Sequence, residues 1–588
     1  MVRKGGKPTR RAFVVGFDRR LDRTSETVVD LHSRRVAMWR EVPNVQPPLM
    51  SEDATLADRV ARGNDEWRSA VRARTGRGLE EVVNAIMPSG NLESVGVHPR
   101  TAILVSYEKV GDLNGYFRPI EGLAALIDLN NLKIVKLIED KSFKHVESDR
   151  PEVTPDTAGL ASRPASPGKP SIRRQGHEIQ WGSWSFRYSF NAREGLVLHD
   201  IRFKDDNRDR TVIARASLSE MVVPYSGAAP TWRPRGPFDV GEFNLGLGAV
   251  DLVAGTVCPE DATMLDVVLH DEFGRPRHRT GLVAVYERDG GVLWKHHDNL
   301  SGRGGAEWAK ELVVTWTAAA GNYDYIFEWT FKVDGAIFVD VILNGVVSVM
   351  KTPPRPKNER GDAIGHDEGH YVADDLMAIH HQHFFCYRID FDVDGESRNR
   401  VLEVDAVPIV SDEGHRRSGS FGPSTRILRR ESAGMSRVDV SKARTWKIVN
   451  LARKNALGEP TGYSLIPGEN SLSLSGPDSP VRRRAGFLDA HVWVTPYDPS
   501  QVFAAGPYPN QGARDAGLKS WCSADRSGCD RHRDCGRVHW GMILATNPPG
   551  RSGVAPFPAR AAARRDHEPK ARSGDPRTSL RTRYDGRI

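Results

Sequence analysis

Two histidines separated by one residue, His381 and His383, have the spacing that points most directly to chemistry. In a β-strand, residues two apart point to the same face, so this pair could bring two imidazoles to one metal ion while Gln382 points away. Imidazole suits copper, zinc, iron and nickel alike, so the spacing leaves the metal open. A surface or purely structural histidine pair is the alternative interpretation.

A predicted β-hairpin lies upstream of this pair. Apolar and polar side chains alternate from residue 325 to residue 333, which is the period of a half-buried strand. Asp334-Gly335 follows and is a strong hairpin signal, and residues 336–343 supply the returning strand. The pattern therefore predicts that Tyr323 lies where a rigid hairpin begins.

Four sequence blocks, in their order along the chain, resemble the copper amine oxidase family. The blocks are Ser217–Tyr225, Phe238–Gly246, Asn322-Tyr323-Asp324-Tyr325 and His381-Gln382-His383. The resemblance covers roughly residues 25–526. It implies an enzyme that oxidises primary amines with O2 to aldehydes and releases ammonia and hydrogen peroxide.

The same resemblance implies a role for each matching residue. Tyr323 would be oxidised by bound copper(II) and O2 to the quinone cofactor topaquinone. His381 and His383 would supply two of the three copper ligands. Tyr225 would hydrogen-bond a quinone oxygen, and Asn322 would hold the ring in register.

Asp239 lies in the block that carries the catalytic base of the family. Amine oxidation needs a carboxylate that removes a proton from the α-carbon of the bound amine. The apolar neighbours Phe238 and Val240 indicate shielding from water, which would favour a base that works near neutral pH. Without the resemblance, the alternative is an aspartate that caps a turn before Gly241.

Asp390 and Asp392 indicate a second, calcium-like site. The two residues share one face of a strand, and each stands an odd number of residues from His383, so that face is opposite to the copper face. Carboxylates suit calcium, and the family has a peripheral metal site here. A charged surface stripe is the alternative.

The C-terminal segment departs from the family pattern. After Arg526 the family has a β-strand and then a block that contains the third copper histidine, whereas this chain becomes rich in Arg, Ala, Pro and Gly. These residues have GC-rich codons, so we infer a frameshift, with true divergence as the alternative. The expected ligand position falls near Ile543. His539 is the nearest candidate for the third ligand, and His532 is the second.

Two other interpretations of this segment stay open. Cys529, His532, Cys535 and His539 could form a small zinc site, although the surrounding pattern of a zinc module is missing. A tail that cannot bury a core is the neutral interpretation. If no third ligand exists, the alternative function is a catalytically impaired or inactive relative.

Three further positions differ from the family pattern. Ala319 replaces a threonine four residues before Tyr323, which predicts slower cofactor formation. Pro237 stands where some relatives have a tyrosine, which predicts an altered mouth of the substrate channel. Cys258 occupies half of a common disulfide, but the partner region near Ala284 has no cysteine, so we expect a free thiol.

The elements that position these residues form a mainly β protein. We expect a small α+β domain over residues 11–140, with helices over 54–62 and 66–74, and a Pro-rich linker over 141–171. Short alternating runs over 172–526 predict a large antiparallel β-sandwich as the catalytic domain. Residues 527–588 are expected to form a basic, disordered tail. The resemblance implies a homodimer, with 462–476 and 491–512 as candidate arms to the other subunit.

Charge and hydropathy exclude several classes of function. Residues 551–588 hold ten Lys/Arg against four Asp/Glu, so this tail carries +6 of the net +7 and the body is nearly neutral, which argues against nucleic-acid binding. No apolar run is long enough to span a membrane. The basic first residues lack the apolar core of a secretory signal, which predicts a cytoplasmic location.

Overall fold

The computed structural model describes most of the chain. The described residues are 10–92, 94–109, 118–141, 143, 171–205, 208–297, 304–353, 368–373, 375–395, 399–410, 416–455, 457–466, 471–512 and 516–523, together with the backbone of 537–544 and 559–565. Among them, no helix has the length and apolar character needed to cross a bilayer.

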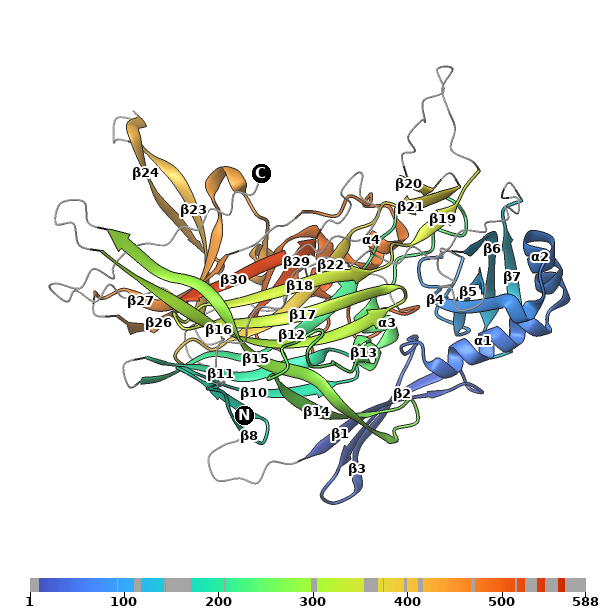
Figure 1. Cartoon of the computed structure of the whole chain (residues 1–588), viewed down its shortest axis with the longest axis horizontal. Helices are drawn as coiled ribbons and strands as arrows, with labels where there is room; N and C mark the ends of the chain where they lie inside the picture. The colour runs from blue at the N-terminus through green and yellow to red at the C-terminus, as the bar shows by residue number, and fades with distance from the viewer. Residues whose placement is uncertain are drawn as a thin grey trace.

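The N-terminal part contains two small sheets and two helices (Figure 1). A three-stranded sheet contains β1 (Arg11–Asp18), β2 (Arg23–Asp30) and β3 (Arg35–Val42), and a four-stranded sheet contains β4 (Val82–Pro88), β5 (Thr101–Glu108), β6 (Pro119–Asp128) and β7 (Lys133–Glu139). Helices α1 (Ser51–Gly63) and α2 (Asp65–Thr75) match the two predicted helices. Asn64 caps α2 by accepting from the Trp67 N–H at 2.8 Å, and Trp67 is fully buried.

Two large antiparallel sheets make up most of the remaining chain, which confirms the predicted mainly β fold. The first sheet has the order β25 (Met435–Ser436), β28 (Val492–Thr495), β29 (Arg537–Leu544), β22 (His383–Phe391), β12 (Arg208–Val222), β11 (Gly195–Asp205), β10 (Trp184–Asn191), β9 (Glu178–Trp181) and β8 (Arg173–Gln175). The second has the order β14 (Thr263–His270), β15 (Pro276–His297), β16 (Gly304–Ala320), β17 (Tyr323–Lys332), β18 (Ile337–Gly345), β30 (Ala559–Arg565), β27 (Pro460–Ile466), β26 (Thr445–Lys454), β23 (Asn399–Val410) and β24 (Arg416–Ile427), with β13 (Ala249–Val250) beside β16. A third, small sheet joins β19 (Val349–Lys351), β21 (Leu376–Ile379) and β20 (Gly369–Ala373).

The main hydrophobic core lies between the two large sheets. The predicted alternation along β17 turns one row of aromatic side chains inward, and Phe327 and Trp329 are almost fully buried. Phe327 meets Phe385 of β22 with ring centroids 6.0 Å apart, and Trp329 meets Tyr387 at 5.8 Å. The predicted hairpin is present, since β17 pairs with β18 across Asp334-Gly335. The two sheets therefore hold β17 and β22, which begin with Tyr323 and His383, face to face.

Two segments of the C-terminal tail are strands, contrary to the expected disordered tail. β29 pairs with β28 and β22, and β30 pairs with β18 and β27. Pairing with these neighbours holds as strand a segment that lacks an alternating pattern, because backbone pairing does not depend on the side-chain pattern. The remainder of 527–588, including the suggested zinc residues Cys529, His532 and Cys535, lies outside the described residues.

The segments expected to be arms pack within their own chain. Residues 460–466 form β27 and residues 492–495 form β28, each inside a large sheet. The segment after β28 contacts the N-terminal part, because the Tyr508 hydroxyl donates to Glu26 at 2.8 Å and Gln511 accepts from the Thr101 N–H at 2.8 Å. The role of 491–512 as an arm to another subunit stays a prediction. This segment joins the N-terminal part to the sandwich.

Candidate active site

Tyr323 lies at one end of the sandwich, in the turn between β16 and β17. It is the first residue of β17 and is 6% exposed. The preceding residue, Asn322, binds the loop after β18 twice, since its Nδ2 donates to the Val346 carbonyl at 3.2 Å and its carbonyl accepts from the Val346 N–H at 2.9 Å. This loop brings the Ser348 N–H to the Tyr323 hydroxyl at 3.0 Å. Asn322 thus fixes the loop after β18 next to Tyr323, and this loop contacts the Tyr323 hydroxyl.

Gly345 allows the close approach of this loop. Its φ is +95°, and a Cβ there would lie 2.4 Å from the Asn322 carbonyl and 2.8 Å from the Tyr323 Cα. A larger residue would push the backbone of Tyr323 away. The end of β18 is therefore shaped around the tyrosine.

His381 and His383 both lie beside Tyr323. The ring centroids of the two histidines are 4.9 Å apart, and those of Tyr323 and His383 are 5.2 Å apart. His381 Nε2 lies 3.3 Å from the Tyr323 hydroxyl, and its Nδ1 lies 2.7 Å from the Ile379 carbonyl. A backbone carbonyl on the far nitrogen orients a metal-binding histidine and leaves Nε2 for the metal.

Burial keeps both imidazoles neutral. It lowers the pKa of His381 to about 4 and the pKa of His383 well below its usual value. Neutral imidazole is the form that binds a metal. The two histidines therefore fit half of a copper site, and Tyr323 is directly beside it.

The third ligand predicted from the sequence is His539, whose backbone lies in β29. In the ladder between β22 and β29, His539 is opposite Arg388, whereas His383 is opposite Leu544. Five residues along a strand span roughly 17 Å. The backbone of His539 is therefore five ladder positions away from that of His383. Among the residues with described side chains, no group of three His, Cys, Asp or Glu is placed to hold a metal.

Tyr225 completes the surroundings of Tyr323. It forms an isolated bridge with His381, and its ring stacks on the His381 ring with centroids 5.1 Å apart. The Tyr225 and Tyr323 hydroxyls influence each other's pKa. Burial raises the pKa of both tyrosines, so both are protonated at neutral pH.

Asp239, the predicted base, is the first residue of α3 (Asp239–Phe243) and is 5% exposed. Burial raises its pKa well above the usual value, and the charges of Glu220 and Glu242 raise it further. Its Oδ2 is buried and has no hydrogen-bond partner. A carboxylate held in this way is a stronger base than one in water.

Buried ionic groups hold the helical turn of Asp239 in place. Glu220 Oε1 accepts from the Gly241 N–H at 3.1 Å, and Glu242 accepts from the Phe238 N–H at 2.9 Å. Gly241 must be glycine, because a Cβ there would lie 2.2 Å from the ring of Pro509 and 2.6 Å from Glu220. The turn is therefore clamped between β12 and the segment around Pro509.

Arg484 ties this turn to the rest of the molecule. It forms an ion pair with the fully buried Glu242, and its guanidinium lies 4.5 Å from the centre of the Phe238 ring. It also donates to Asn91 at 2.6 Å and to the Pro509 carbonyl at 2.9 Å. One cation thus joins α3, the N-terminal part and the C-terminal segment.

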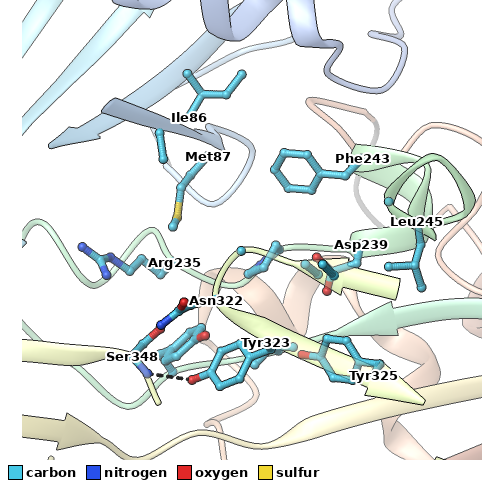
Figure 2. Close-up of a pocket in the computed structure, with 18 of the residues that line it drawn as sticks. Ile86, Met87, Arg235, Asp239, Phe243, Leu245, Asn322, Tyr323, Tyr325 and Ser348 are labelled. Carbon is cyan, nitrogen blue, oxygen red and sulfur yellow. Dashed lines mark hydrogen bonds between the residues drawn. The ribbon is translucent and has the colours of Figure 1, made fainter. Parts of the chain in front are cut away.

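A cavity of about 280 Å³ lies between Asp239 and Tyr323 (Figure 2). Its wall is mostly apolar, and the N-terminal strand β4 contributes part of it. The described lining residues are Ala85, Ile86, Met87, Tyr107, Val223, Tyr225, Arg235, Pro237, Asp239, Phe243, Asn244, Leu245, Gly248, Ala319, Ala320, Gly321, Asn322, Tyr323, Tyr325 and Ser348. Four predicted residues therefore share one cavity, together with Ala319 and Pro237, where the sequence departs from the family pattern.

Sequence reasoning missed Ser348, Arg235 and Glu220. No motif marks Ser348, which reaches the site through a loop, or Arg235, which precedes the Asp239 block. Glu220 lies inside the Ser217–Tyr225 block and is fully buried. An acidic residue in an otherwise apolar stretch of that block is the sequence feature that could have indicated its role.

The remaining predicted residues lie away from the cavity. Asp390 is buried and forms an ion pair with Arg388 at 3.1 Å, and Asp392 follows the end of β22. The ion pair with Arg388 neutralises the negative charge of Asp390, which a calcium site would need. Cys258 is a buried free thiol, as expected from the sequence.

Family models match most of the chain. The copper amine oxidase enzyme domain matches residues 171–536, and the copper amine oxidase N3 domain matches residues 31–154.

Several characterised proteins are similar over most of their length. A primary amine oxidase of Arthrobacter sp. (strain P1) is 34% identical over 537 residues, which cover 90% of this chain and 81% of the relative. Histamine oxidase of Arthrobacter globiformis is 32% identical, with 82% and 70% coverage, and a peroxisomal copper-containing diamine oxidase of Nicotiana tabacum is 32% identical, with 88% and 69% coverage. The fold is similar to that of a copper-containing benzylamine oxidase from Hansenula polymorpha, with a TM-score of 0.80, 24% identity, and coverage of 95% of this chain and 88% of that one.

Proposed function

This chain belongs to the copper amine oxidase family and is an amine oxidase, and we propose that it converts primary amines, water and O2 to aldehydes, ammonia and hydrogen peroxide with a topaquinone formed from Tyr323. The observation that carries the proposal is the placement of Tyr323, whose hydroxyl lies 3.3 Å from His381 Nε2 while the same residue lines a cavity with Asp239. The metal half-site and the base thus meet at one tyrosine.

Each protein group has a separate task in this proposal. Asp239 takes a proton from the α-carbon of the amine, and its raised pKa makes it basic enough for that step. The Ser348 N–H donates to the oxygen of residue 323, and Tyr225 lines the same cavity. The apolar wall of Ile86, Met87 and neighbouring side chains excludes water from the reacting atoms.

The copper ion would be held by His381 and His383, with the third position left for a group outside the described side chains or for solvent. Copper supplies the one-electron chemistry with O2 that converts the Tyr323 ring to the quinone. The donor set supports this metal, because two neutral imidazoles suit copper and lie beside the ring to be oxidised. The homodimer, the cytoplasmic location and the calcium-like site at Asp390 and Asp392 stay predictions.

The test is chemical identification of the quinone. Purified chain is incubated with copper(II) under oxygen, and the peptide that contains Tyr323 is analysed by mass spectrometry and by quinone staining. We expect a redox-cycling quinone on this peptide, and Tyr323→Phe should abolish both the quinone and peroxide release. Tyr463→Phe is the matched control, because Tyr463 is a buried tyrosine of β27 that does not line the cavity. An unmodified Tyr323 peptide in copper-bound protein would contradict the proposal.

A further inference from the structure

The charges around the cavity suggest which amines it admits. Of the described residues that line it, Asp239 is the one acid and Arg235 is the one base. The other lining side chains are apolar or neutral, so a second carboxylate that could receive a second ammonium group is missing from this described lining. An amine that enters therefore meets a negative group at one place and a positive group at another.

Arg235 lies on a different side of the cavity from Asp239 (Figure 2). Its guanidinium stacks on the Trp232 ring at 3.7 Å, its Nε donates to the Thr231 carbonyl at 3.4 Å, and the residue is 9% exposed. A buried arginine keeps its charge. The charge of Arg235 also acts on Tyr225 and Tyr323, where it partly offsets the rise in pKa that burial causes.

Glu121 is a buried carboxyl that interacts with Arg235 and is not part of the described lining. Its carboxylate accepts from Trp232 Nε1 at 3.3 Å and from the Lys351 N–H at 3.2 Å, and it is outside the lining. Burial raises the pKa of Glu121, which favours its neutral form, although the charge of Arg235 opposes that rise. Arg235 is therefore the one cation in the described lining, and Glu121 acts on it from outside that lining.

We propose that this site selects primary monoamines with an apolar tail and rejects α,ω-diamines, and that Arg235 is the residue that determines this specificity. The proposal rests on the proposed function, because it places the reacting amine between Asp239 and residue 323. The tail then lies along Ile86, Met87 and Phe243, where it replaces water with apolar contacts. A second ammonium would lose its hydration, find no carboxylate and face the Arg235 cation.

The size of the cavity fits this class of substrate. Its volume of about 280 Å³ lies at the lower limit of small-molecule sites, which typically measure roughly 300–1,000 Å³. A short alkyl or single-ring tail fits such a space. The volume of the cavity and the charges in its lining therefore both fit small monoamines.

The experiment compares three amines with the same four-carbon chain: butylamine, 4-amino-1-butanol and putrescine. For the copper-loaded wild-type chain at pH 7.5, an assay choice at which putrescine carries two charges (Lys-type amines titrate near 10.4), we expect kcat/KM for butylamine to exceed that for putrescine by about a hundredfold. The amino alcohol should lie between them, since its tail is polar but uncharged. In Arg235→Met the butylamine-to-putrescine ratio should fall at least about tenfold.

Arg235→Lys is the matched control, because it keeps the charge, and its ratio should stay within about threefold of wild type. Equal use of butylamine and putrescine by the wild type would overturn the proposal, and so would an unchanged ratio in Arg235→Met. A ratio explained by polarity alone would show the amino alcohol as poor as putrescine, which also overturns it.

Binding measurements separate this proposal from the proposed function. Calorimetry on the copper-loaded Tyr323→Phe chain, which cannot form the quinone, should show butylamine bound at least about tenfold more tightly than putrescine. If no amine is oxidised but this difference is present, the specificity stands and the oxidase function fails. If amines are oxidised and the difference is absent, the specificity fails alone.

Discussion

The helical turn that carries Asp239 and the segment that carries His381 and His383 both serve Tyr323, but the molecule supports them differently. The turn is held by Glu220 from β12, by Arg484 and by Pro509, all with described side chains. The histidine segment depends on β22 and on its neighbour β29, where the sequence departs from the family. The proposed base is thus held by several separate segments, and the proposed metal site depends on two histidines and on the strand beside them. Changes on the two sides should therefore have separable effects.

The largest effect is expected at the base itself. Asp239→Asn keeps the shape of the side chain and removes its basicity, so kcat should fall by about a thousandfold. Copper content and quinone staining should remain those of the wild type, because Asp239 is not among the groups that contact the histidines. Loss of copper or quinone in this variant would show that the two sides are not separable.

The next effect concerns the ion pair under the base. Arg484→Met leaves Glu242 buried without its partner, and breaking such a pair typically lowers the free energy of unfolding by about 3 kcal/mol. Denaturant unfolding measures this change. Arg23→Met, which removes an exposed pair with Glu41, is the control and should alter stability little. Equal effects of the two variants would contradict the idea that the turn is clamped through Arg484.

A smaller effect is expected on the metal side. Position 544 is opposite His383 in the ladder, and residues directly opposite share one face, so Leu544→His would add an imidazole on the face that holds His383. Copper affinity should rise at least about tenfold, since even the outer partners of a ligand contribute about ten- to a hundredfold. His539→Ala should leave copper content unchanged, because its register partner is Arg388. The copper content of each variant is measured after dialysis. Loss of copper from His539→Ala would contradict the register between β22 and β29.

The smallest effect is a shift in pH dependence. Burial and then the Glu220 charge raise the pKa of Asp239, and the pKa of Glu220 is itself raised to about 7, mainly by burial. Glu220→Gln keeps an acceptor for the Gly241 N–H but removes the charge, so the pKa of Asp239 should fall. The acid limb of kcat/KM should then move to lower pH. Glu328→Gln, at a buried glutamate outside the cavity, should leave the limb in place. An acid limb that stays at the same pH or moves to higher pH in Glu220→Gln would contradict an effect of the Glu220 charge on the pKa of Asp239.

The sequence predicted the parts of the site that local patterns encode. Alternation and Asp334-Gly335 predicted the hairpin of Tyr323, and the two-residue period placed His381 and His383 on one side of that tyrosine. Arg235, Ser348 and Glu220 act through contacts between segments far apart in the chain, which no local pattern records. Their positions required the packing of both sheets and the N-terminal part.

The errors have a common physical origin. The contacts of Tyr508 and Gln511 with the N-terminal part were not predicted, because they join segments far apart in the chain. β29 and β30 were missed because backbone pairing with neighbours, not their own side-chain pattern, holds them as strands. His539 was chosen by distance along the chain, whereas ladder register decides which residues meet.

The contribution of Ala85, Ile86 and Met87 to the cavity has a consequence for how such enzymes diverge. These residues lie on β4, at the edge of the four-stranded N-terminal sheet, and the groups that perform the reaction lie on other segments. Substitutions on one edge strand can therefore change which amines the enzyme accepts and leave the catalysed reaction unchanged. Substrate preference can therefore vary in a part of the chain that contains none of the residues proposed to form the quinone.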